Sequence, residues 1–236
     1  MADEGKSKKK RAEGLITFAA TFCLAWALFS TALMLSLMQT WLYPHLAKDR
    51  VNSRNLSEET VRANYRTLIR YNLQPGGKPL RFDGLPMSER GRSHFAEVKN
   101  IFQGIFVSGV AAWSAVAVFS WRIKKTGGSF TFLLYAFRIS LLFLALLLLP
   151  LLGGFARAFV VFHQLLFNND NWIFDSAVDP VIDYLPSSFF RNMALVILFH
   201  WILLLFVLRF VLYPSLVRKG SRRQSHTGKE SRRTRS

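Results

Sequence analysis

The chain has 236 residues, of which 51% are hydrophobic and 14% aromatic, and its formal net charge is +17. The apolar residues gather into four blocks, each long enough to cross about 30 Å of hydrocarbon as a helix. This pattern excludes a soluble globular domain and predicts a polytopic membrane protein. The basic residues cluster beside the apolar blocks, so the charge indicates membrane flanks and not a nucleic-acid partner.

Four membrane spans are predicted, at Leu15–Leu37, Ile101–Trp121, Phe130 to about Phe159, and Met193–Leu212. The first follows a lysine-rich start and could be mistaken for a signal peptide. Its apolar run exceeds the ~7–15 residues of a signal sequence, and no small-residue cleavage site follows it, so we expect a retained anchor. The single cysteine, Cys23, lies in this span, which leaves no internal disulfide possible.

The basic clusters come before the first span, between the second and third, and after the fourth. These positions lie on alternate sides of a four-span chain, so both termini are expected in the cytoplasm. We therefore divide the chain into a cytoplasmic N-terminus (1–13), a membrane domain (14–214) with external loops at 39–99 and 163–191, and a basic tail (215–236). The tail is expected to be disordered and attracted to anionic lipid headgroups.

The first external loop contains an amphipathic pattern, SEETVRANYRTLIRYN, which predicts a helix from about Glu58 to Tyr71 with Ser57 as its N-cap. Its apolar face is formed by Val61, Tyr65, Leu68 and Ile69. Two placements fit: packing on the external ends of the spans, or a lid on the bilayer with arginines toward headgroups. Beyond it, QPGGKP breaks regular structure, and LRFDGLPMSERG is either a short strand or an extended loop.

The second external loop, NNDNWIFDSAVDPVIDYLPSSFF, is acidic, whereas the first is basic. Opposite charge makes the two loops natural partners. We expect them to pack into one external cap through charge complementarity.

Two histidines mark the borders of the second and third spans. These spans are joined by the short stretch RIKKTGGS and should form an antiparallel hairpin. Counted from that turn, His94 lies roughly 48 Å back and His163 roughly 56 Å forward if both arms are helical. The side chains should therefore lie at similar heights, although Pro150 and Gly153–Gly154 are expected to kink the third span.

A lone histidine at such a border is usually an interfacial aromatic residue with its polar edge in the headgroups. Two at one height, each near acidic residues, favour a site for proton transfer. Glu89 and Glu97 flank His94, and Asp170 and Asp175 follow His163. Glu97 lies one helical turn from His94, where it could orient the imidazole ring.

Other polar residues lie in or near the spans. His200 is deep in the fourth span and is expected to be neutral and hydrogen-bonded within the bundle. Arg138 could snorkel or pair, Arg157 could reach headgroups, and His45 is interfacial.

Several kinds of chemistry lack their motifs. The sequence contains no Gly-x-Ser-x-Gly elbow, no His-Glu-x-x-His zinc motif and no Gly-rich phosphate loop. The only cysteine lies inside a span, which disfavours a thioester intermediate. We expect no metal and no cofactor, and a site of histidines and carboxylates suited to proton transfer on a lipid-borne substrate.

Three stretches, NYRTLIRYN, MSERGRSHFAEVKNIF and FHQLLFNNDNWIFDSAVDPVIDYLPSSFF, resemble the lipoprotein intramolecular transacylase (Lit) family of Gram-positive bacteria. The resemblance covers Leu15 to Leu212, and Glu97 stands where the family is expected to favour Asp. It implies an all-α, four-span integral membrane acyltransferase without a cofactor. The implied reaction moves the sn-2 acyl chain of a diacylglyceryl-cysteine lipoprotein to that cysteine's own α-amino group.

On this resemblance we assign His94 as the general base, oriented by Glu97 or Glu89, and His163 as the group that stabilises the oxyanion or protonates the leaving oxygen. The reverse assignment is equally open. Trp172 and Phe174 would form the floor of the site, and the remaining candidates are Asp175 in support and Tyr65 and Arg157 in substrate binding.

Two alternatives of other classes remain. One is a non-catalytic scaffold or lipoprotein-binding subunit, and the other is an acyltransferase or lipase acting on free phospholipid. Membrane lipids are expected partners in each case, and the sequence does not indicate an oligomeric state.

Overall fold

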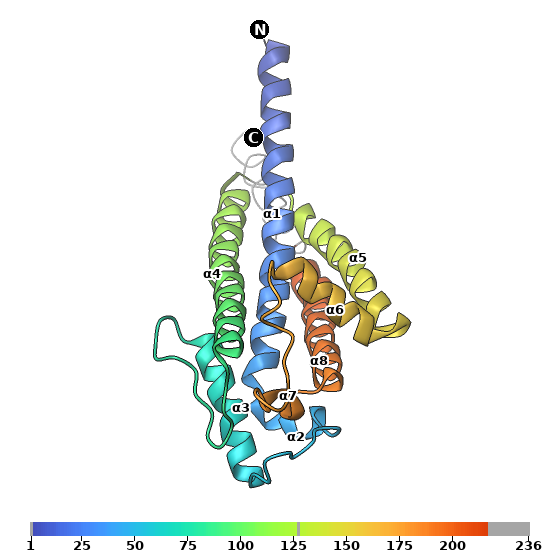
Figure 1. The fold of residues 1–236 in the computed structure, drawn as a ribbon. Coiled ribbons are helices and arrows are strands. Elements are labelled where there is room, and N and C mark those ends of the chain that lie inside the picture. The colour runs from blue at the N-terminus through green and yellow to red at the C-terminus, as the bar shows by residue number, and fades with distance from the viewer. Residues whose placement is uncertain (1, 127, 217–236) are drawn as a thin grey trace. The chain divides into compact units, whose positions relative to one another are not determined.

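The computed structural model describes residues 2–126 and 128–216, and the regular secondary structure of this part of the chain is all helical (Figure 1). The four long helices are α1 (Ala2–Met38), α4 (Glu89–Thr126), α5 (Thr131–Gly153) and α8 (Ser187–Phe206). The shorter elements are η1 (Thr40–Leu42), α2 (Tyr43–Leu46), α3 (Glu58–Leu73), α6 (Phe155–Leu166), α7 (Val181–Tyr184) and the π-helical η2 (Val207–Leu212). The predicted disordered tail lies almost wholly outside the described residues.

The four long helices are each long and apolar enough to cross a membrane, which agrees with the four predicted spans. The boundaries differ in two places that matter for the site. Helix α4 begins at Glu89, well before the predicted span at Ile101–Trp121, so His94 lies on the same continuous helix and N-terminal to that predicted span. The third span ends at Gly153 and not near Phe159, because the helix is interrupted at Gly154.

The break between α5 and α6 has a conformational cause. Gly154 adopts φ 118° and ψ 80°, a region that side chains with a Cβ atom rarely enter. Pro150, inside α5, also removes one backbone hydrogen-bond donor just before the break. The expected kink is therefore a full interruption, and His163 lies on a separate short helix.

The described residues form two compact units. Unit 1 comprises residues 2–31, 109–126, 128–144 and 201–216, and unit 2 comprises Ala32–Ser108 and Ala145–His200.

In unit 1, helices α1 and α4 approach closely at a glycine. A Cβ atom on Gly109 would overlap the side chain of Ser30, so no larger residue fits there without a shift. Nearby, Trp113 Nε1 donates to Thr31 Oγ1 at 2.9 Å, and the Phe29 and Trp201 rings meet edge to face at 5.2 Å. Small residues and interhelical hydrogen bonds of this kind hold membrane helices together.

Unit 2 contains an aromatic core around α3. The helix begins at its predicted N-cap, where Ser57 Oγ accepts from the Thr60 N–H at 3.1 Å, and its apolar face is buried. Tyr65 of this face stacks on Tyr43 with ring centroids 4.5 Å apart, and Phe189 of α8 meets Tyr65 edge to face. Of the two predicted placements, the structure shows the packed helix and not the lid.

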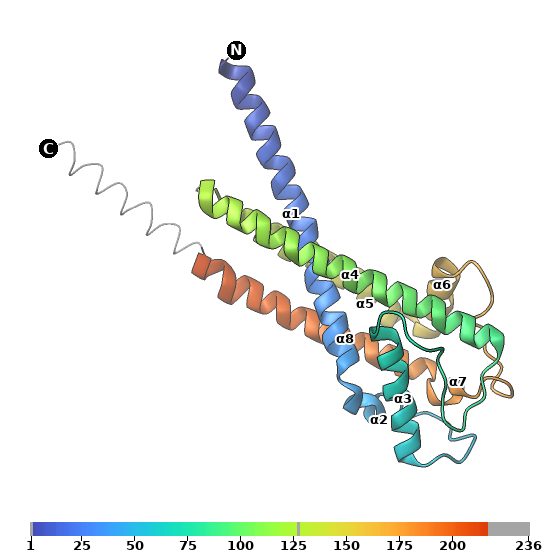
Figure 2. The ribbon, with the colours of Figure 1, turned by 90° about the vertical axis from the view of Figure 1, so that its left-hand side faces the viewer.

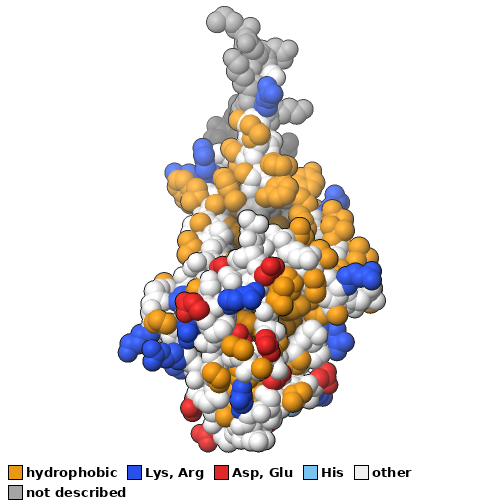
Figure 3. Space-filling model, viewed as in Figure 1, with side chains coloured by type: hydrophobic (Ala, Val, Ile, Leu, Met, Phe, Trp, Pro, Cys, Tyr) orange, Lys and Arg blue, Asp and Glu red, His pale blue; other side chains and the backbone are white. Residues whose placement is uncertain are grey.

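The two segments predicted to form the cap do pack together within unit 2. Val51 N–H donates to Asp183 O at 2.9 Å, and Tyr184 Oη donates to Asn52 Oδ1 at 2.6 Å. Among the described residues, however, the ion pairs all lie within the first segment. Hydrogen bonds and aromatic contacts therefore join the segments, in place of the expected charge pairing, although charged side chains gather over this end of unit 2 (Figure 3).

Candidate active site

The two histidines at the span borders meet in unit 2. His94 lies in the second turn of α4 and His163 in the last turn of α6, with ring centroids 5.8 Å apart (Figure 2 shows both helices). Only 6% and 8% of their surfaces are exposed. The predicted proximity is confirmed, whereas a catalytic role stays a prediction.

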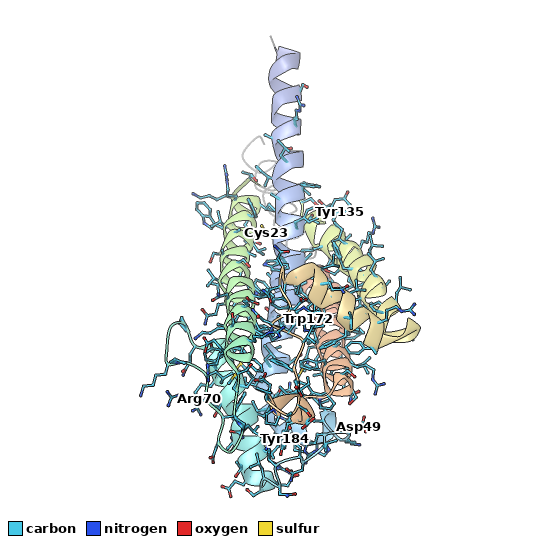
Figure 4. The ribbon with its side chains drawn as sticks, in the orientation of Figure 1. Cys23, Asp49, Arg70, Tyr135, Trp172 and Tyr184 are labelled. Carbon is cyan, nitrogen blue, oxygen red and sulfur yellow. The ribbon has the colours of Figure 1, made fainter. Side chains whose placement is uncertain are left out.

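Aromatic rings enclose the pair. Phe167 contacts both histidines, at 4.8 Å from His94 and 5.7 Å from His163. Phe174 meets His94 edge to face at 5.5 Å, and Trp172, labelled in Figure 4, lies 5.1 Å from His163. The two residues expected to form the floor of the site thus each contact one histidine, and together the rings restrict water around the imidazoles.

The hydrogen bonds of the two rings differ. His163 Nδ1 lies 2.7 Å from the Phe159 carbonyl oxygen, one turn earlier in α6. A carbonyl can only accept, so Nδ1 carries the proton and Nε2 of the neutral ring carries a lone pair. His94 Nδ1 is buried without a hydrogen-bond partner among the described residues.

Both histidines are held in the neutral form. Burial, and then the nearby His163, lower the pKa of His94 to about 4. Burial also lowers the pKa of His163, and its bond to the Phe159 carbonyl acts in the opposite direction. Near neutral pH neither ring is charged, and each offers one N–H donor and one lone pair.

One face of α4 holds the loop that carries Trp172. Arg90 donates to the Asp170 carbonyl at 2.6 Å, and Glu97 Oε1 accepts from Asn169 Nδ2 at 3.0 Å. Residues spaced in this way lie on one side of a helix. The carboxylate of Glu97 therefore binds the loop, whereas the sequence had predicted that it would orient the ring of His94.

The second carboxylate expected to orient His94 also binds elsewhere. Glu89 is exposed and pairs with Arg92 on its own helix at 3.0 Å. Neither predicted orienting carboxylate is hydrogen-bonded to His94 within the part of the chain that the structure describes.

A carboxylate without a predicted role, that of Asp179, fixes the loop to the start of α4. Asp179 is 5% exposed and accepts from both the Ser88 N–H and the Ser88 hydroxyl, each at 2.7 Å. The Ser88 hydroxyl in turn accepts from Gly91 N–H at 3.0 Å, as an N-cap does. The sequence SERG predicts a helix N-terminus, whose positive dipole favours a nearby carboxylate. This pattern does not indicate which of the four aspartates in the second external loop supplies the carboxylate.

Asp175, which the sequence favoured in support of the site, is exposed. Its Oδ1 accepts from Ala177 N–H at 2.9 Å and closes a local turn. The structure thus gives it a role in loop shape and gives no contact with either histidine among the described residues.

The two proposed substrate-binding residues lie in different surroundings. Tyr65 is in the aromatic core of unit 2, and its hydroxyl is buried without a partner in the described part of the chain. Arg157 is exposed on α6, the helix that carries His163. The role of both residues in substrate binding stays a prediction.

His200 belongs to a separate hydrogen-bonded cluster. Its Nδ1 lies 2.9 Å from the Val196 carbonyl, and its Nε2 lies 2.8 Å from Gln39 Nε2. His200 is therefore hydrogen-bonded through both ring nitrogens, as expected, and its predicted neutral form stays a prediction. The described residues contain no group of three or more side chains suited to hold a metal ion.

The model of the lipoprotein intramolecular transacylase Lit family matches residues 17–190, and no curated protein matches the chain. Three solved structures of membrane-integral Lit from Bacillus cereus are similar to it, each at 30% sequence identity. The match to one of them covers 92% of this chain and 99% of the Bacillus cereus chain, with a TM-score of 0.77. Two others, which carry a histidine replaced by arginine or by alanine, have TM-scores of 0.79 and 0.76 and cover 95% and 91% of this chain and 100% and 98% of their own. Because the match extends over most of the chain, this multi-pass membrane protein belongs to the lipoprotein intramolecular transacylase family.

Proposed function

We propose that this enzyme moves the sn-2 acyl chain of a diacylglyceryl-cysteine lipoprotein to the α-amino group of the same cysteine, through His94 and His163. The observation that carries the proposal is the enclosed pair of neutral imidazoles, 5.8 Å apart, which together offer a base and a hydrogen-bond donor. O-to-N acyl transfer needs both, because the amine must lose a proton and the carbonyl oxygen gains charge.

The geometry favours His163 as the base, the reverse of the first assignment made from sequence. Its Nε2 lone pair is fixed by the Nδ1–H bond to Phe159, and that bond raises its basicity. His94 lacks such a bond, and its pKa near 4 makes it a poor proton acceptor. A neutral His94 can still donate an N–H to the developing oxyanion.

In the proposed step, the neutral amine attacks the sn-2 ester carbon, and a C–N bond forms as the carbonyl oxygen becomes an oxyanion held by the His94 N–H. The amine proton passes to Nε2 of His163. The tetrahedral intermediate then collapses with cleavage of the ester C–O bond, and protonated His163 returns the proton to the glyceryl oxygen. An amide and an alcohol form with no net change in protons and without an external acyl donor.

The enclosed site would accelerate the reaction in two ways, by holding the amine and the ester together and by excluding water. Amine and ester belong to one lipid-modified cysteine, so holding them in register replaces a bimolecular encounter, a gain worth up to ~7–11 kcal/mol in well-oriented systems. The rings of Trp172, Phe174 and Phe167 keep water from competing for the acyl group. By the topology predicted from sequence, this site faces the outside of the cell.

Mass spectrometry of a reporter lipoprotein's N-terminal peptide tests the proposal. Cells that express the wild-type enzyme should yield the peptide with an N-acyl chain and a lyso-glyceryl group. An unchanged diacyl peptide despite good expression would refute transacylation and favour a scaffold. Hydrolysis of phospholipid vesicles without lipoprotein would favour the lipase alternative.

Glutamine substitutions test the two roles, since glutamine keeps an N–H donor but is not a base. His163→Gln should lower the rate by ~10²–10⁴-fold, and His94→Gln should retain more activity than His94→Ala. His45→Gln, at an exposed histidine of α2, is the matched control and should behave as wild type. A larger loss in His94→Gln than in His163→Gln would reverse the assignment.

A further inference from the structure

Unit 1 contains a groove that the proposed reaction does not use. It has a volume of about 590 Å³, within the usual range for sites that hold small molecules. Residues of α1 and α5 line it: Glu13, Gly14, Thr17, Phe18, Thr21, Phe22, Thr131, Tyr135, Arg138 and Ile139. Figure 4 labels Tyr135 on α5.

The groove is lined by one cationic side chain, that of Arg138, which has no counterion among the described residues. Arg138 is about two turns into α5, inside an apolar span. No ion pair or hydrogen bond joins its guanidinium to another residue in the described part of the chain, and Glu13, the other charged lining residue, is not paired with it. A charge in such a span requires a partner or water, and charged residues at these positions usually mark a binding function.

The rest of the lining fits a lipid. The rings of Phe18 and Phe22 stand on α1 with centroids 4.7 Å apart, and they are 64% and 42% exposed, which offers an apolar wall for an acyl chain. Thr131 and Tyr135, both exposed on α5 on the same lining as Arg138, supply hydroxyl donors. The hydroxyls of Thr17 and Thr21 on α1 already donate to backbone carbonyls of that helix, so the available hydroxyl donors lie on α5.

We propose that this groove binds an anionic phospholipid, with its phosphate on Arg138 and one acyl chain along Phe18 and Phe22. A guanidinium matches phosphate oxygens in geometry and charge. The basic flanks of the spans predict that this end of α1 and α5 lies in the cytoplasmic leaflet, where anionic lipids and basic pockets between helices meet. The proposal concerns binding in unit 1 and does not depend on the chemistry at the histidines.

Native mass spectrometry of the delipidated full-length protein tests this site. Phosphatidylglycerol and phosphatidylcholine with identical acyl chains are titrated separately, and the fraction of protein with one bound lipid is measured. The wild type should prefer phosphatidylglycerol about fivefold or more, and Arg138→Gln should bring the preference close to one. Arg122→Gln, an exposed arginine of α4 in the same unit that does not line the groove, should keep the wild-type preference.

A groove-filling variant tests the position independently of charge. A Cβ atom on Gly14 meets no other atom within 4 Å, so Gly14→Phe projects into open space and should lower binding of both lipids while Arg138 is retained. Equal binding of the two lipids by the wild type, or an unchanged preference in Arg138→Gln, would overturn the proposal. If Arg138→Gln does not yield stable protein, undiminished binding in Gly14→Phe would overturn it alone.

Discussion

The bond between Asp179 and Ser88 gives the most specific prediction for the site. The carboxylate accepts two hydrogen bonds at 2.7 Å, from the backbone N–H and the hydroxyl of Ser88, in a position that is 5% exposed. Asp179→Asn keeps the shape of the side chain but removes the charge and turns one acceptor into a donor. One of the two donors of Ser88 then faces an amide N–H and is left unpaired.

The expected cost follows from that loss. Hydrogen bonds to charged groups contribute ~1.5–3 kcal/mol, and a buried unpaired donor adds a penalty of similar size, so Asp179→Asn should destabilise unit 2 by about 3 kcal/mol. Because Asp179 anchors the loop that carries Trp172 and Phe174, acyl transfer should fall as well. Thermal unfolding in detergent and the reporter-peptide assay measure the two effects.

Asp175→Asn is the matched control, four residues away in the same loop. Its side chain only closes a turn with Ala177, which asparagine also does, so stability should change by no more than about 0.5 kcal/mol. The combination of Ser88→Ala with Asp179→Asn should cost less than the sum of the single changes, since the residues share one bond. Equal effects of the two asparagine variants, or additivity with Ser88→Ala, would show that this carboxylate does not anchor the loop.

Two further predictions concern the histidines and the helix that carries one of them. The pKa of His94 is near 4 in the folded protein and about 6.5 in the unfolded chain, so its contribution to stability should be fully present above about pH 6.5 and be lost as the pH falls toward 4. Melting temperatures measured from pH 7.5 to 4.5 should therefore decline less in His94→Phe than in the wild type. An unchanged decline would contradict the burial of a neutral ring. Gly154→Ala should destabilise the fold by ~1–3 kcal/mol and lower activity, because a φ of 118° is unfavourable for alanine and Gly154 sets the direction of α6. Gly153→Ala should be tolerated, because a Cβ atom there meets open space. Similar melting temperatures for the two variants would count against a conformational role for Gly154.

The features that sequence predicted well depend on local periodicity. Apolar length identified the four spans, and the 3.6-residue pattern with a serine cap placed α3 at Glu58. Counting along the hairpin brought His94 and His163 to one height. That estimate needed only approximate lengths, which is why it still holds although the helix is fully interrupted at Gly154 and not merely kinked.

The features that sequence did not predict depend on which of several possible partners a side chain contacts in the folded protein. Glu97 lies one turn from His94, so a same-helix partner was the natural expectation, but Asn169 from the loop takes the carboxylate instead. Asp175 and Asp179 lie in a segment without helical periodicity, and only docking on Ser88 distinguishes them. Gly153–Gly154 signalled a change of direction but could not say that the helix would end there.

The orientation of Glu89 and Glu97 away from His94 has a chemical consequence. A carboxylate bonded to an imidazole raises its pKa and favours the charged ring. A charged ring would repel the substrate's ammonium group, whose pKa is ~7.7–8, and could not accept its proton. A backbone carbonyl, here that of Phe159, fixes the tautomer of His163 without adding a full negative charge. In the proposed reaction, aromatic enclosure and this carbonyl therefore supply a neutral base at physiological pH, a state that a histidine–carboxylate pair would not favour.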